Sequence, residues 1–267
     1  PYDYAEGYKF KGDGYSPKLV KQALEKAKAA DVVLLFIGLT PEYESEGFDR
    51  RHIDMPDSHV ILAEEIAKVN PNVVAVLSCG APVQLDRVEP ASRAILNMYL
   101  GGQAVGIATR DIIYGDVNPS GKLAETFPLK ESDSLSSLYF PMGPRNVQYR
   151  ESVYVGYRYF EAVDKPVRYP FGFGLSYTEF EYSDLTLSAS AIDEGEPLTV
   201  TFKVKNTGSR DGAEIAQVYV SDLVSTIFRP VKELRAFKKV FLKAGEEKEI
   251  SLTLDSRAFA YYNVLIK

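Results

Sequence analysis

Apolar runs alternate with helically spaced apolar residues through the first half of the chain. Between Pro17 and Ala30 the apolar residues fall on one stripe of a helix, with Ser16 as a suitable cap and Pro17 at the first position. The run Val32 to Ile37 follows at once. Its β-branched and aromatic content, without polar alternation, predicts a buried strand that is covered on both faces.

The same alternation continues to about residue 115. The further predicted elements are a helix over 60–69, a strand over 73–77, a buried strand over 94–99 and a helix over 108–113. Asn70 and Pro71 stop the first of these helices, and Gly115 ends the second. Strands that alternate with helices predict an α/β fold, a mainly parallel sheet with helices on both faces.

The pattern changes twice beyond this point, so the chain divides into three predicted regions. An α/β sandwich domain is expected over 1–130. Over 131–178 periodicity fades while tyrosine, phenylalanine, proline and glycine accumulate, which predicts an ordered aromatic-rich connector that packs against domain surfaces. An all-β sandwich is expected over 179–267. Its predicted strands are LTVTFKVKN (198–206), AEIAQVYVSD (213–222), KKVFL (238–242) and KEISLTL (248–254).

Composition and charge exclude several classes of function. The 267 residues are 45% hydrophobic and 25% charged, as expected of a globular protein long enough for two cores. A net charge of -6 argues against binding to nucleic acid or anionic lipid, because either would need a clustered basic face. No apolar run approaches the roughly 20 residues of a membrane helix. We therefore expect no nucleic-acid partner and no membrane partner.

Neither a metal nor a cofactor is expected. The single cysteine, Cys79, follows an apolar run and is interpreted as a buried core thiol. With only His52 and His59 there is no cluster of soft metal ligands. The glycines over 101–106 lack the dinucleotide-binding fingerprint. The lone cysteine and the lack of a signal region are compatible with a cytoplasmic bacterial protein.

Candidate chemistry lies directly after the strand over 32–37. The segment DVVLLFIGLTPEYESEGFDRR (31–51) passes from apolar residues into four acids and two arginines. In open α/β sheets, ligand sites form at the carboxyl ends of the strands. The acids placed there are Glu42, Glu44, Glu46 and Asp49. A catalytic loop and a solvated acidic loop both fit this pattern.

Five blocks of sequence then occur in a specific order. They are ESEGFDRRHIDMP (44–56), GAPVQLD (80–86), GGQAVGIATRDIIYGDVNPSGKLAETFP (101–128), YRESVYVGYRYF (149–160) and YPFGFGLSYTEFEYS (169–183). Together they resemble the carboxyl-terminal part of glycoside hydrolase family 3, the β-glucosidases. The resemblance implies an α/β sandwich followed by a fibronectin type III-like domain. The segments 204–220 and 229–242 also resemble that second domain.

The resemblance also implies a mechanism and its residues. Family members retain anomeric configuration by means of an aspartate nucleophile on a (β/α)8 barrel and a glutamate acid/base on a loop of the α/β domain. Retention requires the two carboxyl groups to lie about 5 Å apart, so this loop must reach the barrel's substrate site. The resemblance places the proton donor at Glu46, before Gly47, with Glu44 as the alternative. Arg50 either pairs with Asp49 to orient the loop, which we favour, or binds a sugar hydroxyl.

The sequence departs from the family pattern in one important respect, because no barrel is present. The nucleophile must then lie on a barrel domain outside these residues, and the chain alone is expected to be inactive. The first strand of the α/β domain and the last strand of the β-sandwich are also expected to be absent. We therefore interpret the 267 residues as a piece of a longer enzyme.

Two functions from different classes remain open. The first is a part of an exo-acting, β-glucosidase-like hydrolase that releases a terminal β-linked sugar from an oligosaccharide or other β-glycoside. The second is a non-catalytic carbohydrate-binding or interaction module with the same folds. Tyr154, Tyr157 and Tyr159 could stack on sugar rings in either case, although a packing role is favoured.

Overall fold

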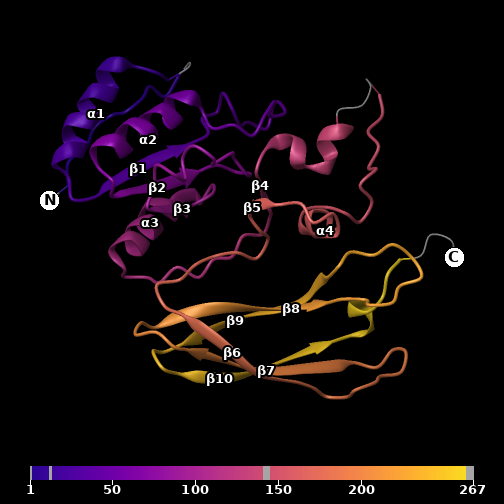
Figure 1. Cartoon of the computed structure of the whole chain (residues 1–267). Helices are drawn as coiled ribbons and strands as arrows, with labels where there is room; N and C mark the ends of the chain where they lie inside the picture. The colour runs from indigo at the N-terminus through magenta and orange to yellow at the C-terminus, as the bar shows by residue number, and fades with distance from the viewer. Residues whose placement is uncertain (1, 12–13, 141–144, 263–267) are drawn as a thin grey trace. The chain divides into compact units, whose positions relative to one another are not determined.

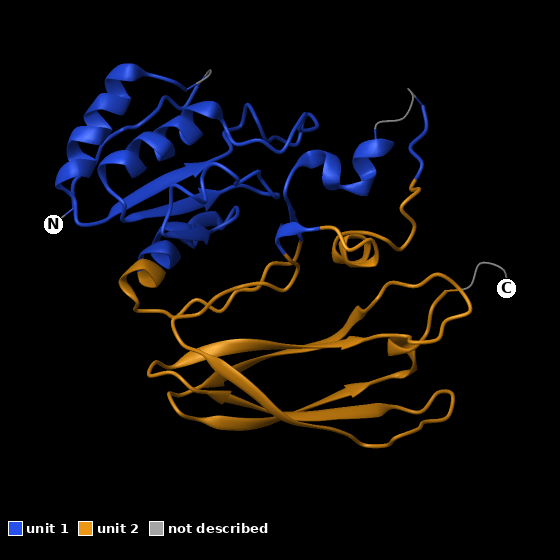
Figure 2. Cartoon of the chain, viewed as in Figure 1, with its two compact units in different colours: residues 1–110, 126–148, 166–169 blue, residues 111–125, 149–165, 170–267 orange. Residues whose placement is uncertain are grey.

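The computed structural model describes residues 2–11, 14–140 and 145–262 (Figure 1). The chain forms two compact units, coloured separately in Figure 2. Unit 1 contains residues 1–110, 126–148 and 166–169, and unit 2 contains residues 111–125, 149–165 and 170–267. The end of the sandwich that was expected to be incomplete, over 263–267, lies outside the described residues.

Unit 1 is built around a parallel sheet of three strands in the order β1-β2-β3. The strands are β1 (Val33–Gly38), β2 (Val73–Ser78) and β3 (Ala94–Asn97). The helices that alternate with them are α1 (Pro17–Ala29), α2 (Asp57–Val69) and α3 (Val105–Tyr114), whose last residues belong to unit 2. A short antiparallel pair joins β4 (Phe127–Pro128) to β5 (Val167–Tyr169). The predicted α/β class is confirmed.

The helix ends follow the sequence signals, but α2 and α3 each begin three residues earlier than predicted. Pro17 occupies the first turn of α1 as predicted, but the Ser16 side chain makes no capping hydrogen bond. The side-chain amide of Asn70 donates to the carbonyls of Ala27 and Ala30 at 2.8 and 2.7 Å and so satisfies the end of α1. Gly115 follows α3 with a φ of +78°, a conformation that glycine adopts without strain.

The prediction that the strand over 32–37, which is β1, is covered on both faces is wrong. Leu35 and Ile37 of β1 are buried, whereas Leu34 and Phe36 are 39% and 55% exposed. Successive side chains of a strand point to opposite faces, so the described residues cover only one face of β1. The β3 side chains, also predicted to be buried, are half-buried or exposed. An all-apolar run shows that both faces tolerate burial, not that both are covered.

Unit 2 contains a β-sandwich of two antiparallel sheets, in the orders β10-β7-β6 and β8-β9. The strands are β6 (Phe180–Leu187), β7 (Leu198–Asn206), β8 (Gly212–Val220), β9 (Glu233–Leu242) and β10 (Glu247–Leu254). Val204, Val240 and Leu242 are among the residues of its buried core. The short helix α4 (Tyr157–Ala162) also belongs to this unit. The predicted fibronectin type III-like sandwich is confirmed.

One strand of this sandwich, β6, was not among the predicted strands. Its pairing with β7 shifts register between Ser183 and Thr186, and Asp184 between them has a φ of +55°. A bulge of this kind adds a residue to one strand and breaks the period of two by which a strand is recognised in a sequence.

Candidate active-site loop

The candidate site begins where β1 and β2 end side by side. Gly38 pairs with Ser78, and a Cβ at Gly38 would lie 2.0 Å from the Ser78 carbonyl oxygen. The Gly38 N–H donates to Nδ1 of His59 at 3.3 Å, and the Tyr8 ring packs on this imidazole with centroids 3.9 Å apart. Burial lowers the pKa of His59 to about 4, so the imidazole is a neutral acceptor at ordinary pH. The acidic loop therefore leaves the sheet from a tightly fixed point.

The first half of the loop is a turn that brings Glu44 to the segment after β2. The Thr40 carbonyl accepts hydrogen bonds from the backbone N–H groups of Tyr43 and Glu44 at 2.9 and 3.0 Å. The Glu44 carboxylate then accepts the Gly80 N–H, with Oε2 at 2.8 Å from the nitrogen. A Cβ at Gly80 would lie 2.6 Å from Glu44 Oε1, so a side chain there would displace this oxygen.

The second half of the loop is a small hairpin with Glu46 at its tip. Ser45 and Phe48 form an isolated antiparallel bridge, which leaves Glu46 and Gly47 as the two residues of the turn. Glu46 is exposed, and no hydrogen bond or ion pair joins its carboxylate to another residue in the described part of the chain. Of the two glutamates proposed as proton donor, Glu44 is therefore engaged by the backbone and Glu46 is available to a ligand.

Arg50 lies on the far side of the hairpin and is held by the main chain. Its Nη1 donates to the Pro82 carbonyl at 3.2 Å, and its Nη2 is buried without a hydrogen-bond partner among the described residues. Asp49 is exposed. The expected ion pair between Asp49 and Arg50 is absent from the residues that the structure describes. The loop-orienting role predicted for Arg50 would then come from its bond to Pro82.

Residues 79–84, which we call the support segment, accompany the loop along its length. Glu44 meets Gly80, Arg50 meets Pro82, and the Ile53 carbonyl accepts the N–H of Gln84 at 2.8 Å. The structure thus brings together the acidic loop and the block GAPVQLD (80–86), which are separated by some 30 residues in the sequence. Neither the role of Gly80 nor that of His59 was recognised from the sequence.

Of the three tyrosines considered for sugar stacking, Tyr157 packs inside unit 2. Its ring stacks on Phe171 with centroids 4.8 Å apart and meets the edge of Tyr219 at 6.0 Å. Its hydroxyl accepts the Leu234 N–H at 2.8 Å. The packing role predicted for this tyrosine is consistent with these contacts.

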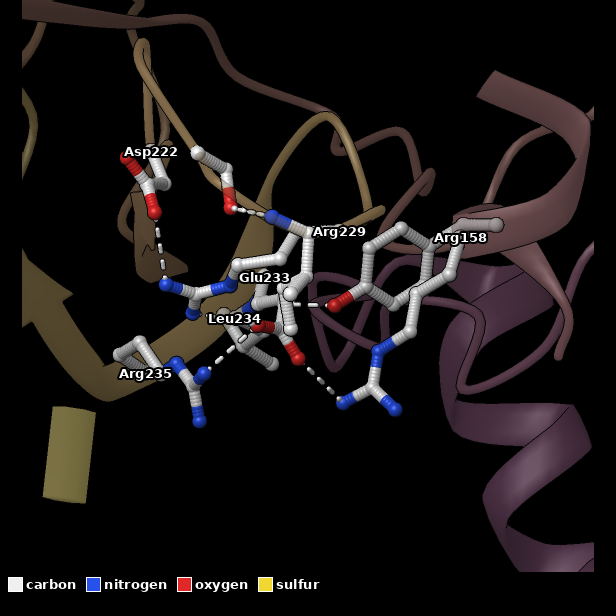
Figure 3. A network of polar contacts seen from close by, with 9 residues as sticks. Arg158, Asp222, Arg229, Glu233, Leu234 and Arg235 are labelled. Carbon is white, nitrogen blue, oxygen red and sulfur yellow. Dashed lines mark hydrogen bonds and ion pairs between the residues drawn. The ribbon is translucent and has the colours of Figure 1, made fainter. Parts of the chain in front are cut away.

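A second group of charged side chains in unit 2 is bonded quite differently. We call it the Glu233 cluster (Arg158, Asp222, Arg229, Glu233 and Arg235), and Figure 3 shows the arginines arranged around the Glu233 carboxylate. That carboxylate lies 2.7 Å from Arg235, 3.3 Å from Arg229 and 3.4 Å from Arg158. Arg229 also pairs with Asp222 at 3.0 Å. The Glu233 side chain is only 13% exposed, so its charge is used within the fold.

Other kinds of site receive no support from the described residues. No group of three or more histidine, cysteine, aspartate or glutamate side chains is arranged to hold a metal ion in the part of the chain that the structure describes. Among the same residues, no helix has the length and apolarity needed to cross a bilayer. Cys79 is fully buried, as predicted.

Comparison with known proteins decides the family. The model of the glycosyl hydrolase family 3 C-terminal domain matches residues 7–177, which include the whole acidic loop and the support segment. This chain belongs to glycosyl hydrolase family 3. A fibronectin type III-like domain model matches residues 214–266, within the β-sandwich of unit 2.

The relatives of this chain include enzymes with different named activities. The chain is 48% identical over 264 residues to thermostable beta-glucosidase B of Acetivibrio thermocellus, covering 99% of this chain and 35% of that protein. It is 44% identical over 261 residues to an exo-alpha-(1->6)-L-arabinopyranosidase of Bifidobacterium longum, covering 98% and 34%. The chain thus spans about a third of the length of these curated relatives.

A solved structure of the family agrees closely with the fold. The crystal structure of the family 3 beta-glucosidase of Bifidobacterium adolescentis matches with a TM-score of 0.93 and 44% identity, over 97% of this chain and 38% of that one. The structure of beta-glucosidase 3B of Thermotoga neapolitana in complex with glucose matches with a TM-score of 0.85 and 34% identity. The order of an α/β region and a β-sandwich is therefore shared with these enzymes.

Proposed function

We propose that this chain supplies Glu46 as the acid/base of a retaining, exo-acting glycoside hydrolase that releases a terminal β-linked sugar. The nucleophile would be an aspartate on a (β/α)8 barrel domain outside these 267 residues, as the family resemblance implies. Relatives named as beta-glucosidases favour a β-glucoside as substrate. The chain alone has no second carboxylate in this role, so it should not turn over substrate.

The observation that carries the proposal is the placement of Glu46 at an exposed hairpin tip beside an engaged Glu44. A retaining enzyme needs its two carboxyl groups about 5 Å apart, so an acid/base contributed by one domain to another must project from its own domain. Glu46 projects in this way and has no partner among the described residues, whereas the Glu44 carboxylate accepts the Gly80 N–H. The bond from Arg50 to Pro82 supports a loop-holding role for that arginine rather than sugar binding.

The proposal is tested with the full-length polypeptide that carries this sequence, assayed on p-nitrophenyl β-D-glucoside. Glu46→Gln should lower kcat by about 100-fold or more, because general acid–base catalysis typically contributes a factor of this size. Azide should restore turnover, since this small anion can attack a glycosyl intermediate without a general base. The 267-residue chain should be inactive under the same conditions. Ordinary activity of the Glu46→Gln enzyme would refute the assignment and favour a binding module.

A further inference from the structure

The hairpin that carries Glu46 is fixed at both of its ends by the support segment. On one side, Glu44 immediately precedes Ser45, where the hairpin begins, and binds the Gly80 N–H. On the other side, Arg50 follows Phe48 by two residues and binds the Pro82 carbonyl. The hairpin itself has a single bridge, so its direction depends on these two anchors.

The Glu44 anchor is the shorter of the two. A carboxylate that accepts a backbone N–H forms a charge-assisted hydrogen bond, and the 2.8 Å distance is within the range for such bonds. The corresponding bond from Arg50 is longer, at 3.2 Å. A Cβ at Gly80 would lie 2.6 Å from Oε1 and would force this end of the Glu44 side chain to shift. The carboxylate of Glu44 and the absence of a side chain at Gly80 thus both contribute to the same contact.

We propose that Glu44 is a positioning residue, whose carboxylate on the Gly80 amide holds the hairpin in the orientation that lets Glu46 protonate the leaving group. This inference rests on the proposed function, in which Glu46 is the acid/base. Glu44 itself touches neither the leaving group nor the sugar. Its role is to fix the direction of a short, exposed hairpin before substrate binds, so that no ordering is required at the moment of proton transfer.

The proposal predicts a defect that depends on the leaving group. A weakly basic leaving group, such as 2,4-dinitrophenolate, departs from an aryl glycoside without being protonated. Phenolate is more strongly basic and needs a proton from the acid in order to depart. A misdirected Glu46 therefore lowers the rate of hydrolysis of phenyl β-D-glucoside far more than that of the dinitrophenyl compound. Partial unfolding would lower the rates for both substrates by the same factor, so the ratio of the two rates separates positioning from stability.

The experiment measures kcat/KM of the full-length enzyme on phenyl and 2,4-dinitrophenyl β-D-glucosides. Glu44→Ala should lower the value for the phenyl compound by about 10- to 100-fold, as expected for a displaced catalytic group, and the dinitrophenyl value by less than about threefold. Glu44→Gln should stay within about threefold of the parent on both substrates, because its amide oxygen can accept the same N–H. Glu25→Ala, an exposed carboxylate on α1, serves as the matched control and should change neither value.

A change at Gly80 tests the same contact from the other partner. Gly80→Ala should displace the Glu44 carboxylate and reproduce the leaving-group dependence of Glu44→Ala. The double variant Glu44→Ala with Gly80→Ala should be no worse than Glu44→Ala alone, since both changes remove one interaction. Additive losses in the double variant would show that Gly80 acts independently of Glu44 and would overturn the proposal.

The remaining outcomes separate the failure of this inference from the failure of the proposed function. Parent-like kinetics of Glu44→Ala would overturn the positioning role while leaving Glu46 as the acid/base. If Glu44→Gln is as inactive as Glu44→Ala and azide restores both, then Glu44 is the acid/base itself, and both proposals fall. If Glu46→Gln alone keeps ordinary activity, the assignment of Glu46 is wrong.

Discussion

The acidic loop and the Glu233 cluster are both dense in charge, but their carboxylates have opposite surroundings. At the tip of the loop, Glu46 is exposed and has no described partner. In the cluster, Glu233 lies within ion-pair distance of three arginines and is almost entirely removed from solvent (Figure 3). A carboxylate that already accepts several bonds within the fold can offer few to a ligand. A carboxylate without such bonds can bind a substrate without breaking any contact of the fold.

The comparison also shows what holds each group in place. In the Glu233 cluster the charged side chains hold one another, and Tyr157 accepts the N–H of Leu234, the residue after Glu233. The acidic loop is instead held from outside, by the support segment and by the neutral His59 below Gly38. Removing a charge from the Glu233 cluster should therefore destabilise unit 2, whereas removing one from the acidic loop should leave unit 1 folded. Three predictions test how the two groups are held.

The largest effect on stability is expected from Glu233→Ala in the 267-residue chain. The change leaves Arg158 and Arg235 without this carboxylate in a largely buried site, which should lower the free energy of unfolding of unit 2 by about 4 kcal/mol. Urea unfolding and hydrogen exchange of the β9 amides measure the loss.

The control for this change is Glu194→Ala, which removes an exposed carboxylate from the same unit. It should alter the unfolding free energy by no more than about 0.5 kcal/mol, as is usual for surface substitutions. Similar losses in the two variants would show that the Glu233 cluster contributes no more than an ordinary surface charge, and the contrast with the loop would disappear.

A somewhat smaller effect is expected from the pH dependence of His59. Its folded-state pKa is lowered to about 4 by burial, so folding disfavours the protonated imidazole. Stability from this residue is fully present above the unfolded pKa of about 6.5 and is lost as pH falls from there toward 4, by up to about 3 kcal/mol. His59→Phe should remove that part of the pH dependence, although it also lowers stability at neutral pH because the Gly38 N–H loses its acceptor.

Unfolding followed by helical circular dichroism at several pH values measures this difference. If His59→Phe retains the parent's full pH dependence, then the base of the acidic loop does not depend on a neutral imidazole.

The smallest effect on stability is expected from Glu46→Gln, the change that should abolish catalysis. An exposed carboxylate without a described partner contributes little to folding, so the unfolding free energy should change by no more than about 0.5 kcal/mol. Thermal unfolding of the parent and the variant tests this expectation. A loss of several kcal/mol would mean that Glu46 is a structural residue, and it would weaken both the comparison and the proposed function.

Much of the fold could be predicted because its signals are local. The helix over Pro17–Ala29 is marked by its apolar stripe and its proline, and the end of α3 is marked by Gly115. The strand β6 was missed because the bulge at Asp184 interrupts the alternation that identifies a strand. The exposure of Leu34 and Phe36 could not be predicted either, since an apolar run does not say which of its faces is covered.

The candidate site, like the fold, could be predicted from the sequence only in part. The position of the acids after β1 predicted a candidate ligand site, and the family resemblance ranked Glu46 above Glu44. What distinguishes the two glutamates in the structure is the Gly80 N–H, which lies 36 residues away in sequence from Glu44. No local pattern marks a backbone amide as the partner of a distant carboxylate. The role of Gly80 follows only from the space that its missing Cβ leaves.

The bonding of Glu233 has a consequence for heat resistance. The hydration of charged groups becomes less favourable as temperature rises, so keeping these side chains away from water costs less in a hot solution. The hydrophobic stabilisation of the sandwich core does not grow in the same way over that range. The share of the sandwich's stability that depends on Glu233 is therefore expected to increase toward the melting temperature.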